Sequence, residues 1–87
     1  NTEIIKLVIN KVYSCVAEKE IELAMEKARI LTGMAPEDYK IEKLGTTIAK
    51  CEEGIITINP DIIHYSKEII EYVVIHEFCH LNYIYNM

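Results

Sequence analysis

Near its end the chain reads Tyr72-Val73-Val74-Ile75-His76-Glu77-Phe78-Cys79-His80-Leu81. The segment contains the pattern His-Glu-x-x-His among uncharged residues, which predicts a buried turn of an apolar helix. On a helix, His76 and His80 lie about one turn apart on the same face. Two imidazoles so placed can bind one Zn²⁺ at about 2.0–2.1 Å each. Glu77 then occupies the position of a general base that takes a proton from water at the metal.

A third metal ligand is the part of such a site that the sequence does not identify. A catalytic zinc site needs three protein ligands and an open position for water. His64 is the only other histidine and precedes the predicted helix, so we expect it on the surface of a connector. Cys79 lies near the same face, but its apolar neighbours favour a role in the core, and Glu71 is expected to point elsewhere. Tyr83 or Tyr85 could assist an oxyanion, although packing is the favoured role for each.

Length and composition indicate one small domain with an acidic surface. The 87 residues are 51% hydrophobic and 26% charged, and the net charge is −5. This charge argues against nucleic acid or anionic lipid as a partner, since both require a basic face. No apolar run reaches the roughly 18 residues needed to span a bilayer.

The three cysteines bear on the compartment. Cys15, Cys51 and Cys79 are odd in number and have no close spacing, so neither a disulfide framework nor a Cys-x-x-Cys zinc site is indicated. We interpret them as reduced thiols in a cytoplasmic protein, each buried like a small hydrophobic residue. No signal-peptide pattern is seen at the start of the sequence.

The first third of the chain is predicted to be helical. Residues 3–32 contain no Gly or Pro, and apolar residues recur at spacings of three and four. Thr2 is the expected N-cap, and Gly33 is the expected C-terminal stop. Because thirty residues is long for a globular helix, we expect either one long helix or a pair with a kink near Tyr13.

The middle of the chain changes to a period of about two residues, which predicts strands. The expected strands are 39–44, 46–51 and 55–59, with a hairpin turn at Glu52-Glu53-Gly54. Short connections favour a three-stranded antiparallel meander. Ser66 is then the predicted cap of the final helix, from about Lys67 to at least Leu81. The fold class expected is α+β.

Three segments of the sequence resemble the YgjP-like metallopeptidase domain, a family of cytoplasmic zincins related to the minimal gluzincin-type peptidases. They are Lys43-Leu44-Gly45-Thr46, the strand 55–59, and the helix 68–81 with its Tyr-Val-Val lead-in and His-Glu-x-x-His motif. The first segment departs from the family pattern, with Lys for Arg, Leu for an aromatic residue and Thr for Ser. The hairpin around Glu52 is also longer than is usual in the family.

The resemblance implies a single zincin-like metallopeptidase domain over residues 1–87. It implies a peptide or protein substrate, one zinc ion held by His76 and His80, and Glu77 as the catalytic base. The family places its third ligand in an Asn-His-Ser segment shortly after the helix, and this sequence has no His there. We therefore expect the domain to be truncated at its C-terminus, and the uncovered apolar helix to promote self-association of the fragment.

The sequence is compatible with two other functions. One is a catalytically incomplete zincin-fold interaction domain that lacks the third ligand. The other is a repressor-cleaving regulatory zincin, although the Tyr72–Val74 lead-in and the hairpin spacing favour the YgjP-like branch.

Overall fold

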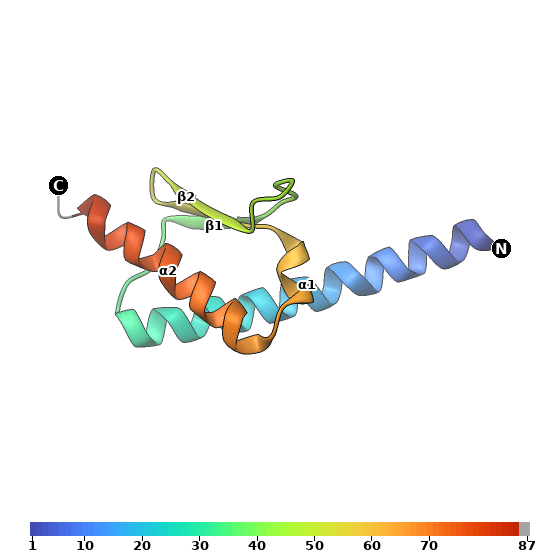
Figure 1. The fold of residues 1–87 in the computed structure, drawn as a ribbon, viewed down its shortest axis with the longest axis horizontal. Helices are drawn as coiled ribbons and strands as arrows, with labels where there is room; N and C mark the ends of the chain where they lie inside the picture. Colours follow the sequence, from blue (N-terminus) through green and yellow to red (C-terminus); the bar gives the residue numbers. More distant parts are fainter. Residues whose placement is uncertain (86–87) are drawn as a thin grey trace.

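A long helix, a three-stranded sheet and a second helix follow one another along the chain (Figure 1). The computed structural model describes the backbone of residues 1–85 and the side chains of residues 1–81. Its elements are α1 (Thr2–Thr32), β1 (Asp38–Ile41), β2 (Ala49–Glu52), β3 (Ile55–Ile58), the 3₁₀ helix η1 (Pro60–His64) and α2 (Lys67–Tyr85). The predicted α+β class is confirmed. Neither helix is long and apolar enough, over the described residues, to cross a membrane.

Helix α1 is a single unbroken helix rather than a kinked pair. Its N-cap is Asn1, whose side chain accepts a hydrogen bond of 2.8 Å from the Glu3 backbone N–H, so the prediction of Thr2 as cap is wrong by one residue. Its end is as predicted: Gly33 has a φ of 71°, and its N–H donates to the Arg29 carbonyl at 2.9 Å. Glycine adopts this left-handed conformation without steric cost, which ends the helix here.

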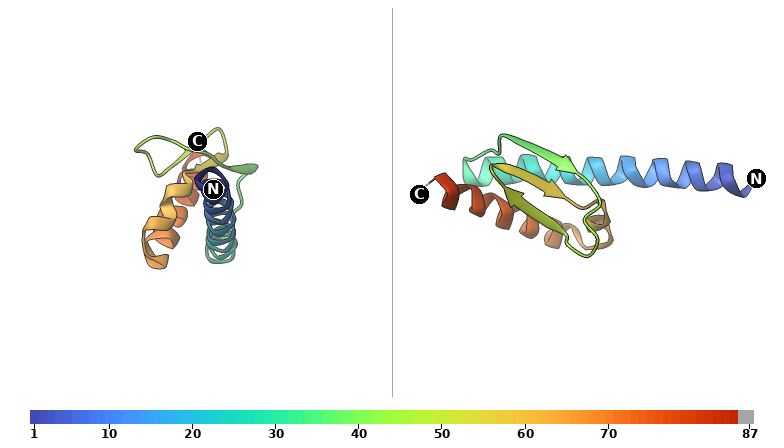
Figure 2. Two further views of the ribbon diagram at one scale, coloured as in Figure 1. Left: turned by 90° about the vertical axis from the view of Figure 1, so that its right-hand side faces the viewer. Right: turned by 90° about the horizontal axis from the view of Figure 1, so that it is seen from above.

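The two halves of α1 have different surroundings. The C-terminal half packs into the core through Ala17, Ile21, Ala24, Met25 and Ala28. The N-terminal half projects beyond the sheet and α2, which gives the molecule extents of 54 × 21 × 20 Å (Figure 2). The aliphatic side chains that predicted a helix here are exposed; Val8 and Val12, for example, expose 56% and 57% of their surface.

The sheet is mixed, so the predicted antiparallel meander is wrong. Its strand order is β1-β3-β2, with β1 parallel to β3 and β2 antiparallel to β3. Only the β2–β3 hairpin matches the prediction, and its two-residue turn places Glu53 at φ 52° and Gly54 at φ 82°. Positive φ at both positions is the geometry that matches the natural twist of a hairpin.

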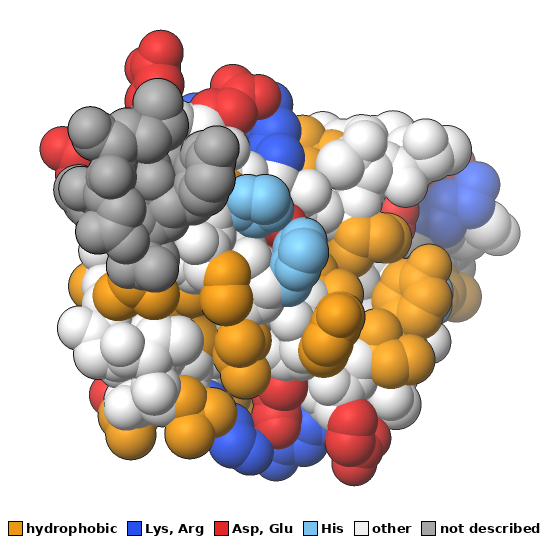
Figure 3. Space-filling view, turned by 60° about the vertical axis from the view of Figure 1, so that its left-hand side comes forward, with side chains coloured by type: hydrophobic (Ala, Val, Ile, Leu, Met, Phe, Trp, Pro, Cys, Tyr) orange, Lys and Arg blue, Asp and Glu red, His pale blue; other side chains and the backbone are white. Residues whose placement is uncertain are grey.

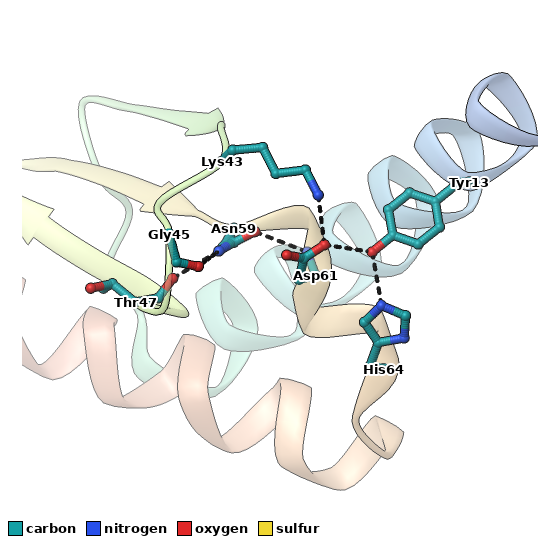
Figure 4. Close-up of polar contacts among 7 residues, drawn as sticks. All are labelled: Tyr13, Lys43, Gly45, Thr47, Asn59, Asp61 and His64. Carbon is teal, nitrogen blue, oxygen red and sulfur yellow. Dashed lines mark hydrogen bonds and ion pairs between the residues drawn. The ribbon is translucent and has the colours of Figure 1, made fainter. Parts of the chain in front are cut away.

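The most apolar strand takes the centre of the sheet. In β3, Ile56 and Ile58 point to the same face and are both fully buried, and β-branched side chains pack well on such a face. The loop after β1 crosses the end of β3 to reach β2, and Asn59 holds it there (Figure 4). The Asn59 amide donates to the carbonyls of Gly45 (3.3 Å) and Thr47 (2.9 Å). Asn59 is itself buried, so this side chain fixes where β2 begins.

A second polar cluster ties α1 to η1 (Figure 4). The Tyr13 hydroxyl and the Lys43 ammonium each donate to Oδ1 of Asp61, both at 2.7 Å. Nε2 of His64 lies 3.2 Å from the Tyr13 hydroxyl oxygen. The hydrogen bonds from Lys43 and Tyr13 lower the pKa of the Asp61 carboxyl below its ordinary value of 3.8. The cluster therefore depends on an ionised Asp61.

Acid should weaken this cluster in a defined pH window. A carboxyl whose pKa is lower in the folded state stabilises the fold above its unfolded pKa, and this contribution is lost as the pH falls through the folded value. We expect the thermal unfolding midpoint to fall below pH 4 less steeply in Asp61→Asn than in the wild-type protein. Glu42→Gln, a change of an exposed carboxylate outside the cluster, is the control and should follow the wild-type curve. Identical pH profiles for Asp61→Asn and wild type would contradict the assignment.

Helix α2 completes the core by packing against α1, β2 and η1. It begins as predicted at Ser66, whose hydroxyl accepts a hydrogen bond of 3.3 Å from the Ile69 N–H. Phe78 and Val74 are fully buried on its inner face. The position of this helix is thus set by its apolar side, which leaves the opposite side free to carry polar groups.

Phe78 should be the side chain whose loss costs most in stability. Truncation of a fully buried Phe to Ala costs about 3–5 kcal/mol, against a total of about 4–13 kcal/mol for a domain of this length. We expect Phe78→Ala to reduce the free energy of unfolding in urea by that amount. Ile30→Ala, at a side chain that is 74% exposed, should change it by less than about 0.5 kcal/mol. Similar losses in the two variants would show that α2 is not packed as described.

Candidate metal centre

Helix α2 brings together the three polar side chains of the His-Glu-x-x-His motif. The ligand atoms of His76, Glu77 and His80 all lie within 4.8 Å of one another. The two imidazole rings meet edge to face, with centroids 4.9 Å apart and an interplanar angle of 89°. This proximity follows from the helical rise, which sets residues four apart on one face.

The three side chains differ in burial. Glu77 is buried, with 7% of its surface exposed, whereas His76 and His80 are exposed. Figure 3 shows histidine side chains side by side at the surface, with hydrophobic side chains below and to the right of them. The expectation of a fully buried turn is therefore wrong for the histidines, because the apolar side of α2 faces the core and the histidines stand at its margin. Both rings are open to a ligand from solvent.

Strand β2 lies against the buried side of this group. The side chain of Cys51, from β2, is half-buried and packs against the core. Burial raises the pKa of its thiol above the ordinary value of 9.0, and the negative charge of Glu77 raises it further. Cys51 is consequently a neutral thiol at physiological pH. The charge of Glu77 acts on this thiol because β2 packs against α2.

Other residues considered from the sequence lie apart from the group. His64 is exposed in η1 and contacts Tyr13, as expected for a connector residue. Glu71 points to α1, where both carboxylate oxygens accept from Lys27 at 2.9 Å. Cys79 is exposed, so the prediction that it packs in the core is wrong. Cys15 is exposed as well, on the projecting half of α1. The side chains of residues 82–87, including the two candidate tyrosines, lie outside the described residues.

The donor set fits a zinc ion. Two imidazole nitrogens are preferred zinc ligands, and an adjacent carboxylate completes the polar surroundings of such sites. Across residues 1–81, no further His, Cys, Asp or Glu joins the group of His76, Glu77 and His80. The described part of the chain thus offers two imidazoles and one carboxylate as candidate ligands.

One neighbour of the group was not singled out from the sequence. The ring of Tyr72 lies against that of His76, with centroids 6.4 Å apart and an interplanar angle of 18°. Tyr72 precedes His76 by four residues, so helical spacing alone was a sufficient signal for the contact. No spacing in the sequence relates Cys51 to Glu77, because the two residues come near each other only through the packing of β2 against α2.

Comparison with known proteins agrees with this geometry. The family model of the YgjP-like metallopeptidase domain matches residues 1–84. No curated protein and no solved structure shows significant similarity to the chain. The match covers nearly the whole sequence, including α1, the sheet and the His-Glu-x-x-His helix. The chain belongs to the YgjP-like metallopeptidase domain family.

Proposed function

We propose that this protein is a zinc-dependent peptidase in which His76 and His80 bind the metal and Glu77 is the general base. Its membership of a metallopeptidase family supports metal-dependent peptide hydrolysis as the activity. The observation that carries the assignment of residues is the grouping of two exposed imidazoles with one buried carboxylate within 4.8 Å. A third ligand would come from outside the group that residues 1–81 form.

Each side chain has a part in the reaction that follows from its position. A zinc ion held by His76 and His80 would lower the pKa of a bound water towards about 7 and polarise the scissile carbonyl. Glu77 accepts the proton of the attacking water and passes it to the leaving amine. Its burial suits this role, because a carboxylate shielded from bulk water is held in one place and interacts more strongly with its partners.

Strand β2 is the part of the sheet best placed to hold a substrate. It is an edge strand, since the order is β1-β3-β2, and it is the edge that packs against α2. An extended peptide can add to a free strand edge through main-chain hydrogen bonds. Strand β3 has no free edge for such a peptide, because it is paired with β1 on one side and with β2 on the other.

Removal and return of the metal tests the proposed function. We expect hydrolysis of a mixed peptide pool to stop when a strong zinc chelator is added and to recover when one equivalent of zinc is restored. Cobalt, which accepts similar ligands, is a useful second ion because its visible spectrum reports its coordination. Hydrolysis that is insensitive to chelation would contradict a metallopeptidase. Weak metal binding without hydrolysis would instead favour the catalytically incomplete interaction domain.

A further inference from the structure

Tyr72 is unusually exposed for a large aromatic side chain in a small domain. It exposes 71% of its surface on α2, one turn before His76. A side chain this exposed removes little apolar area from water, so it contributes little to folding. The fold therefore offers no explanation for a tyrosine at this position.

The contact that Tyr72 does make is with a ring of the candidate metal site. The two rings are nearly parallel, at 18°, and their centroids lie 6.4 Å apart, within the range of offset-stacked aromatic pairs. On its other side the His76 ring meets the His80 ring edge to face at 4.9 Å. His76 is thus placed between two rings, one of which has no other evident role.

The orientation of His76 needs such a contact. Metal-binding histidines are usually held by a hydrogen bond from their second ring nitrogen to a carboxylate or carbonyl. Among the side-chain hydrogen bonds of residues 1–81, the only one that involves a histidine is that of His64 with Tyr13. Besides the edge-to-face contact with His80, stacking against Tyr72 is therefore the restraint that the described structure provides for the exposed imidazole of His76.

We propose that Tyr72 is a positioning residue for the metal site, which holds the His76 imidazole in the orientation that directs it toward His80 and Glu77. This inference rests on the proposed function, because it gives His76 the role of a metal ligand. The phenol hydroxyl takes no part in the stacking, so a phenylalanine ring should serve equally well. An alanine should leave His76 free to turn among its rotamers.

Two substitutions at Tyr72 test the proposal. From the free energy of a stacked aromatic pair, we expect Tyr72→Ala to weaken zinc binding by about 3- to 10-fold. Tyr72→Phe should retain zinc affinity within about 2-fold, because it keeps the ring. Affinity is measured on the full chain by competition with a chromogenic zinc chelator. In the metal-free protein, the NMR signals of the His76 ring should move toward values averaged over rotamers in Tyr72→Ala and stay in place in Tyr72→Phe.

Tyr65→Ala is the matched control, since it removes a tyrosine that is 47% exposed and lies before α2. It should change neither zinc affinity nor the His76 signals. A Tyr72→Ala variant with wild-type affinity and unchanged His76 signals would overturn the proposal. If the wild-type chain bound no zinc, the proposed function would be in error, and the metal-free NMR comparison would still decide whether Tyr72 orients His76.

Discussion

Replacement of Glu77 by glutamine is expected to abolish peptide hydrolysis while leaving zinc binding intact. Glutamine has nearly the same shape as glutamate but cannot accept a proton, so the variant loses the general base and keeps the local packing. General-base catalysis contributes about 10²- to 10⁴-fold to a rate, and we expect kcat/KM to fall within that range. Zinc content should stay near the wild-type value, because in the proposed mechanism the carboxylate does not bind the metal.

The control for this experiment is Glu71→Gln, the same chemical change on the same helix. Glu71 pairs with Lys27 on α1 rather than with the histidines. The activity of the Glu71→Gln variant should therefore match that of the wild-type protein. The assays use the chain together with any residues that its gene encodes after Met87, because a catalytic site needs a third protein ligand. A Glu77→Gln variant with activity within about tenfold of wild type would exclude Glu77 as the base. Loss of zinc from that variant would instead identify Glu77 as a ligand.

Replacement of His76 by alanine is expected to remove zinc binding without unfolding the protein. His76 is exposed, so its truncation leaves no cavity in the core, and alanine favours the helix. Replacement of a residue that hydrogen-bonds to a metal ligand lowers metal affinity by about 10- to 100-fold, and removal of a ligand itself should lower it further. We therefore expect affinity to fall by more than about 100-fold, as measured by calorimetric titration.

His64→Ala provides a matched control on the third histidine of the chain. His64 contacts Tyr13 in the cluster between α1 and η1, apart from the candidate metal centre. Its replacement should leave zinc affinity unchanged. Equal losses of affinity in the His64 and His76 variants would show that zinc binds to histidines without the geometry of the motif.

Features determined by neighbours along the chain were predictable. The end of α1 at Gly33 follows from a left-handed C-cap, and the turn at Glu53-Gly54 follows from the positive φ that a two-residue hairpin requires. The convergence of His76, Glu77 and His80 likewise needs only the periodicity of a helix. The observed N-cap, Asn1, lies one residue before the predicted one, Thr2. Both residue types are good N-caps, so local sequence does not choose between the two positions.

Features determined by distant contacts were not predictable in the same way. The parallel pairing of β1 with β3 requires a loop that crosses the end of β3, and the Asn59 hydrogen bonds to this loop cannot be inferred from a local pattern. The exposure of Cys79 and of both motif histidines depends on which side of α2 the core covers. The approach of Cys51 to Glu77 requires the packing of β2 on α2, which no spacing in the sequence encodes.

Zinc K-edge absorption on the wild-type protein tests the central claim most directly, because it measures the atoms that bind the metal. We predict one zinc per chain with two imidazole nitrogens at about 2.0–2.1 Å, and loss of this signal in His76→Ala. A zinc ion surrounded by sulfur at about 2.3 Å, as cysteine ligands would give, would contradict the account. So would an unchanged spectrum in the His76→Ala variant.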